Sequence, residues 1–73
     1  MGLRVHFDID LALDGGMWGA LIGPNLVEGE SGWGDTPFEA LRDLTTVIGK
    51  ETAGMDPGQV VNYLDQLHRG TAK

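Results

Sequence analysis

The sequence of 73 residues contains no cysteine, so neither a disulfide bond nor a cysteine-ligated zinc site supports its fold. A chain of this length buries only about 60% of the surface that its unfolded state exposes, which leaves a small core. Small domains without disulfides commonly complete the core with a metal or a partner chain. We therefore expect self-association, as a homodimer or a higher homo-oligomer.

Basic residues are scarce as well. Five Lys and Arg stand against eleven Asp and Glu, and the formal net charge is −6. Such a chain repels the phosphate backbone of nucleic acids, which disfavours direct nucleic-acid binding. A basic protein is the favoured partner because opposite charges accelerate encounter. The alternative explanation of the acidic balance is solubility alone.

Long hydrophobic runs are absent too. No stretch approaches the roughly 20 apolar residues that a membrane-spanning helix needs. The N-terminus lacks the basic-then-apolar pattern of a signal peptide. We therefore expect no membrane association and a cytoplasmic location. Hydrophobic residues make up 41% of the chain and recur periodically, which is typical of a folded domain rather than a disordered one.

The first third of the chain has the pattern of a β-hairpin. Residues 4–14 alternate between apolar and polar side chains, which predicts a half-buried strand. Asp14-Gly15-Gly16 predicts a tight turn because glycine readily adopts positive φ, and residues 17–22 form the returning strand. Gly23-Pro24-Asn25 ends that strand, and we expect a third strand from Leu26 to about Ser31. The apolar positions expected to face the core are Val5, Phe7, Ile9, Leu11 and Leu13.

A helix start follows the third strand. Thr36 suits the N-cap, Pro37 suits the first helical position, and Glu39 completes a capping box. The helix should run from Pro37 to about Lys50. Its apolar stripe comprises Phe38, Leu41, Leu44, Val47 and Ile48.

A second helix start shows the same pattern of an N-cap residue, a proline and a polar residue three positions after the cap. Asp56, Pro57 and Gln59 predict a helix over residues 57–69 that Gly70 terminates, followed by fraying of the last residues. The order β-β-β-α-α predicts an α+β fold, a three-stranded antiparallel sheet with helices on its apolar face. We expect one domain over residues 1–73, with its core at about 4–50.

Several side chains could in principle bind a metal or a phosphate or act in catalysis, but none forms a convincing catalytic, cofactor or metal site. His6, Asp8 and Asp10 share a strand face, yet same-face neighbours lie about 6.6–7 Å apart, which is loose for a metal. The segment GESGWG precedes a helix but lacks both the spacing and the lysine of a phosphate loop. The single serine, Ser31, has no evident base, and we expect no catalysis.

Exposed aromatic and acidic residues are better candidates for a partner surface. Trp18 and Trp33 are either core residues or interface anchors, and Trp33, between two glycines, is the one we expect to be exposed. The candidate contacts are Trp33, Glu28, Glu30 and Asp35. An edge strand of the sheet is also open, either to a second copy or to a foreign protein that adds a strand.

The stretch DGGMWGALIGPNLVEGESGWGDTPFEALRDL resembles the N-terminal domain of HicB-like antitoxins. The family pattern has a D-x-G-G-aromatic hairpin, a P-x-L-x-G turn, and G-D-T-x-x-E-A-L at a helix start. The matching segments here are Asp14–Gly16 with Trp18 and Ala20, Pro24 with Leu26, Gly34–Thr36 and Glu39–Leu41. The glycine of the proline turn is displaced by one residue, to Gly29. The resemblance covers about residues 5–50.

The resemblance implies a partial ribonuclease H-like β-β-β-α core, an oligomer, and neutralisation of a small basic RNA-cleaving toxin of the HicA type. Residues 56–73 are too short and too poor in basic residues for the DNA-binding segment of longer family members, so we expect a stand-alone minimal form. The alternative function is a small phage- or plasmid-encoded inhibitor of a host defence system, similar to an anti-CRISPR protein. A small enzyme or metal-binding protein ranks last.

Overall fold

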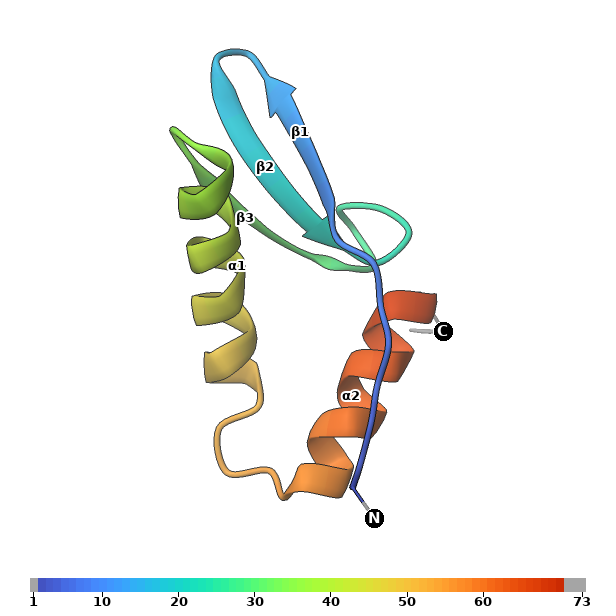
Figure 1. The fold of residues 1–73 in the computed structure, drawn as a ribbon. Helices are drawn as coiled ribbons and strands as arrows, with labels where there is room; N and C mark the ends of the chain where they lie inside the picture. Colours follow the sequence, from blue (N-terminus) through green and yellow to red (C-terminus); the bar gives the residue numbers. More distant parts are fainter. Residues whose placement is uncertain (1, 71–73) are drawn as a thin grey trace.

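The computed structural model describes residues 2–70 and confirms the α+β fold with the order β-β-β-α-α. The strands are β1 (Asp10–Asp14), β2 (Met17–Ile22) and β3 (Glu30–Gly34), and the helices are α1 (Pro37–Glu51) and α2 (Pro57–Arg69). They form one antiparallel sheet in the order β1-β2-β3 (Figure 1). The expected fraying concerns residues 71–73, which lie outside the described range.

The hairpin forms as its sequence predicts. Gly15 and Gly16 have φ of 62° and 85°, the two positive values that a type I′ turn requires, and Asp14 pairs with Met17. The prediction of a strand from residue 4, however, is wrong. β1 begins only at Asp10, and because β2 ends at Ile22, residues before Ile9 have no β2 residue opposite them; Val5, Phe7 and Ile9 are still half-buried and alternate with exposed neighbours.

The third strand is also shifted from its predicted position. β3 begins at Glu30, because the residues before it fold into a turn held by Asn25. The Asn25 side-chain oxygen accepts hydrogen bonds from the backbone N–H groups of Val27 and Glu28, both at 2.9 Å. The Gly29 N–H donates to the Asn25 carbonyl at 2.9 Å. These local hydrogen bonds compete successfully with a strand ladder over residues 26–29.

Both helices begin at the predicted residues. Thr36 Oγ1 accepts from the Glu39 N–H at 3.1 Å, but the Glu39 carboxylate accepts from Asp35, one residue before the cap, rather than completing the expected box. In α2 the Asp56–Gln59 capping box is complete, and Gly70 ends the helix in the left-handed conformation. Both helix starts and the end of α2 therefore follow from local sequence, whereas α1 ends at Glu51 with Thr52 rather than a glycine as its C-cap.

The core lies between α1 and the strands β2 and β3. Its fully buried members are Ala20, Ile22, Ala40 and Leu44. Gly32 and Gly34 on β3 let α1 approach closely, since a Cβ atom at Gly32 would overlap the backbone of Leu44. α2 has no fully buried residue; it lies beside the N-terminal segment and contacts the core through Leu67 (Figure 1).

Candidate binding surface

Trp33 is exposed, as the sequence predicts, and 38% of it is accessible. It lies opposite Gly19 in the β2–β3 pairing, and its indole ring packs on that glycine, where a Cβ atom would come within 2.7 Å of the ring. The backbone N–H of Trp33 donates a hydrogen bond to the Asp43 carboxylate of α1 at 2.9 Å. Trp33 therefore presents part of a fixed ring on the sheet face that α1 does not cover.

Asp35 lies near Trp33, whereas the other two acidic candidates do not. Asp35 is exposed just beyond the end of β3, and its N–H donates to Glu39 Oε1 at 2.9 Å. Glu30 begins β3, about 10 Å of strand length from Trp33. Glu28 precedes it in the Asn25 turn, and both glutamates are half-buried.

The four candidate contacts also differ in the sheet face that they occupy. Glu30 pairs with the buried Ile22, so its side chain lies on the α1 face, while Trp33 lies on the opposite face. The structure thus divides the candidates into two groups, Trp33 with Asp35 and Glu28 with Glu30.

The residues that sequence reasoning missed are apolar. Leu11 and Leu13 were expected in the core, yet they are 42% and 60% exposed on β1, and Phe38 at the start of α1 is 79% exposed. The reason is geometric, because a helix about 10–12 Å wide covers two strands that lie about 4.8 Å apart, and α1 covers β3 and β2. The number of strands is the signal that could have identified the two leucines, because one helix packed on a three-stranded sheet leaves the third strand uncovered.

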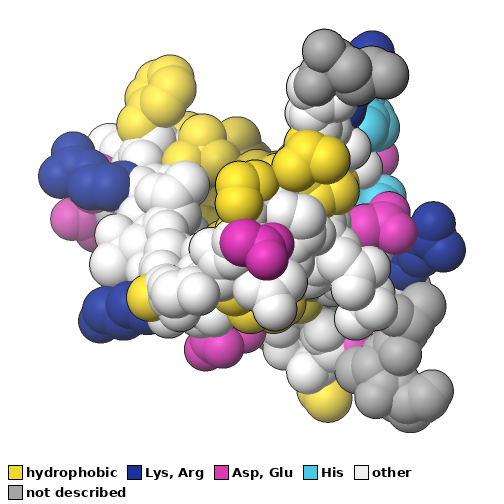
Figure 2. Space-filling view, turned by 90° about the horizontal axis from the view of Figure 1, so that it is seen from below, with side chains coloured by type: hydrophobic (Ala, Val, Ile, Leu, Met, Phe, Trp, Pro, Cys, Tyr) yellow, Lys and Arg dark blue, Asp and Glu magenta, His cyan; other side chains and the backbone are white. Residues whose placement is uncertain are grey.

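We call the exposed Leu11, Leu13 and Phe38, together with the half-buried Trp18 and Leu41, the uncovered apolar face. Leu13 pairs with Trp18 in the hairpin, so both side chains project on the α1 side of the sheet. Leu41 lies on the opposite flank of α1 from Asp43, which contacts the outer edge of β3. The face therefore lies between α1 and β1. Hydrophobic side chains are also exposed on the side of the molecule that Figure 2 shows from below, where they group near the middle of the view with an acidic side chain beside them.

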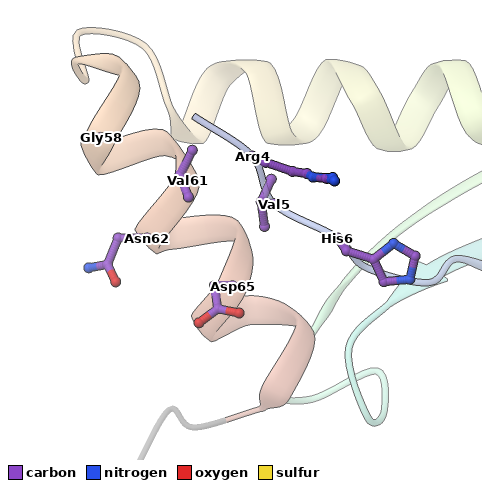
Figure 3. A pocket seen from close by; sticks show the side chains of 7 residues that line it. All are labelled: Arg4, Val5, His6, Gly58, Val61, Asn62 and Asp65. Carbon is purple, nitrogen blue, oxygen red and sulfur yellow. The ribbon is translucent and has the colours of Figure 1, made fainter. Parts of the chain in front are cut away.

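Two of the shallow hollows on the described part of the chain lie elsewhere. One of about 440 Å³ lies between the N-terminal segment and α2, lined by Arg4, Val5, His6, Gly58, Val61, Asn62 and Asp65. Figure 3 shows the side chains of Arg4 and His6 directed away from α2, so the polar groups do not converge on one point. Asp65 is also paired with Arg69 at 3.1 Å. The other hollow, of about 310 Å³, lies beside Trp33 and Asp43.

The residues considered for a metal do not gather into a ligand set. His6 Nε2 lies 3.9 Å from Asp8 Oδ1, and both side chains are largely exposed. Among residues 2–70, no group of three or more His, Cys, Asp or Glu is placed to hold a metal ion. The segment GESGWG supplies β3 itself rather than a loop.

One titratable side chain in the described residues is clearly perturbed. Burial raises the pKa of Tyr63 on α2 above its usual value of 10.0, and the negative charges of Glu30 and Glu51 raise it further. The Tyr63 hydroxyl therefore lies within electrostatic range of Glu30, at the start of β3, and of Glu51, at the end of α1.

Within the described part of the chain, neither helix has the length and apolar character needed to cross a membrane. Comparisons with protein-family models, with curated proteins and with solved structures found no match to this chain.

Proposed function

We propose that the chain is a non-catalytic, cytoplasmic binding protein similar to HicB antitoxins, which neutralises a small basic RNA-cleaving toxin of the HicA type by direct contact. The supporting observation is an uncovered apolar face within an acidic region. From Val5 to Leu41 the sequence carries seven Asp and Glu and no Lys or Arg. Apolar patches near charge are typical of protein-binding sites, and the sequence segment that contributes most of this face is acidic.

The test is capture of the tagged protein from its native cell lysate, with mass spectrometry of the bound proteins. We expect one small basic protein at near-equal stoichiometry. That protein is then purified and assayed for RNA cleavage with and without the chain, and we expect the chain to abolish cleavage. Capture of a large ribonucleoprotein or a defence enzyme would overturn the proposal in favour of a defence inhibitor. A captured partner that cleaves no RNA would also overturn it.

We also propose that the chain is a homodimer or a higher homo-oligomer. The support lies away from the uncovered apolar face, in the turn between β2 and β3. Val27 is 92% exposed and follows the exposed Leu26, so two consecutive apolar side chains contribute little to the folded monomer. Burial of such a pair against a second copy would remove apolar surface from water. Sedimentation velocity measures the state directly, and a purely monomeric species at high concentration would contradict this proposal.

A further inference from the structure

The two edges of the sheet differ in how far they are open. Asp14 and Met17 close a two-residue hairpin and form a hydrogen-bonded pair, and such pairs alternate along an antiparallel ladder. The backbone groups of Asp10, Ala12 and Asp14 therefore bond to β2, while those of Leu11 and Leu13 point outward. By the same alternation, the backbone N–H of Trp33 points outward from β3, where it donates a hydrogen bond to the Asp43 carboxylate. The chain thus satisfies one outward N–H group of β3 with its own carboxylate, whereas β1 is an edge strand with no neighbouring strand on its outer side.

The side chains on β1 differ between its two faces. Leu11 and Leu13 project on the α1 side and belong to the uncovered apolar face, whereas Asp10 and Asp14 project on the other side and are exposed. A strand added to this edge would have residues directly opposite them on both faces. Apolar residues would match the two leucines, and Lys or Arg would match the two aspartates.

The same aspartates disfavour a second copy at this edge. A two-fold antiparallel pairing centred on Ala12 would place Asp10 opposite Asp14 at both ends. A pairing centred on Leu11 would place Asp8 opposite Asp14. Like charges directly opposite each other destabilise a strand pair. A pairing centred on Leu13 would engage only residues 12–14, because the chain turns at Gly15.

We propose that the open edge of β1 binds an extended, basic segment of a partner protein by strand addition, with apolar residues alternating with Lys or Arg. The backbone groups of Leu11 and Leu13 hydrogen-bond to that segment. Its apolar side chains cover the uncovered apolar face, and its basic side chains lie opposite Asp10 and Asp14. This inference rests on the proposed function, because it assigns the surface through which the basic partner binds.

The probe is a capped nine-residue peptide of alternating Val and Lys, titrated into the labelled protein and followed by NMR. We expect the amide exchange of Leu11 and Leu13 to slow at least tenfold at saturation, while that of Trp33 is unchanged. A peptide of alternating Val and Glu serves as the charge control. A Val–Lys peptide with N-methyl groups on every second amide, along the edge that would face β1, serves as the backbone control. We expect at least tenfold weaker binding of both controls.

Two variants test the assigned charges. Asp10→Lys combined with Asp14→Lys should lose the Val–Lys peptide and bind the Val–Glu peptide instead. Glu51→Lys combined with Asp65→Lys is the control, because it makes the same change in net charge on the helices instead of on β1. This control variant should bind the Val–Lys peptide at least fivefold more tightly than the β1 variant does.

Two results would overturn strand addition while leaving a basic partner intact. One is equal binding of the N-methylated peptide, and the other is binding without protection of the Leu11 and Leu13 amides. Failure of every basic peptide to bind would also overturn it. The proposed function fails separately, if capture from the lysate recovers no basic protein.

Discussion

Gly32 on β3 lies directly against the backbone of Leu44 on α1, so close that a Cβ atom at Gly32 would overlap the Leu44 nitrogen and lie 2.6 Å from the Ala40 carbonyl oxygen. Helix and strand meet here without an intervening side chain. The contact sets the height of α1 above the sheet and, with Gly34, the strands that the helix covers. It also gives the glycines of GESGWG a packing role.

Gly32→Ala should destabilise the protein by about 1–3 kcal/mol, because the added methyl group meets backbone atoms that cannot move independently. Gly49→Ala is the matched control. No atom lies within 4 Å of a Cβ at that exposed helical position, so alanine should stabilise the protein by about 0.5–1 kcal/mol. Urea unfolding of both variants gives the two free energies. Equal effects would contradict the close approach of α1 to β3.

Leu44→Ala should cost about 2–5 kcal/mol, because Leu44 is fully buried and its removal leaves a cavity between α1 and the sheet. Phe38→Ala on the same helix should change the free energy of unfolding by less than about 0.5 kcal/mol, since the ring is mostly exposed. Thermal or urea unfolding compares the pair. A large loss for Phe38→Ala would show that its ring belongs to the core, as the sequence pattern predicted.

Trp33→Ala should cost about 1 kcal/mol, since it removes a partly exposed ring from Gly19 but keeps the backbone bond to Asp43. We expect a larger effect on affinity for the captured partner, because exposed tryptophan is enriched at binding hot spots. Calorimetric titration of wild type and variant measures that affinity. Unchanged binding would remove Trp33 from the set of contacts.

Tyr63 predicts a loss of stability at alkaline pH. Its pKa is higher in the folded state than in the unfolded one, so folding favours the neutral phenol. The resulting stabilisation is complete below the unfolded pKa near 10 and declines as the pH rises through the folded pKa. Melting temperatures measured across this range should fall more steeply for wild type than for Tyr63→Phe. As Tyr63 is the single tyrosine, phenolate absorbance reports its titration directly.

Val27→Asp should shift the proposed oligomer toward the monomer while leaving the free energy of unfolding of the monomer nearly unchanged. Val27 lies in the exposed turn held by Asn25, where a charged side chain stays in water. Sedimentation velocity across a range of concentrations checks the association, and unfolding at low concentration checks the fold. Leu21→Val, a conservative change in β2, is the control for nonspecific loss of association.

Local sequence by itself determined the hairpin turn, the second strand and both helix starts. Gly15-Gly16 specifies its own backbone geometry, and the Thr36 and Asp56 caps satisfy backbone groups within three residues. These elements depend on neighbours in the chain, so their prediction needed no knowledge of packing. The Asn25 turn was equally local, but the glycine and apolar residues around it suggested a strand.

Only the tertiary structure decided which apolar residues are buried. Periodicity predicts the face of β1 on which Leu11 and Leu13 lie, but it does not show what covers that face. The position of α1 over β3 and β2 depends on the contact of Gly32 with Leu44, which links residues twelve apart in the sequence. Because one helix covers two strands, β1 keeps its edge and its leucines accessible. The accessibility of β1 therefore depends on how α1 packs on the sheet and not on the hydrophobic periodicity of the strand.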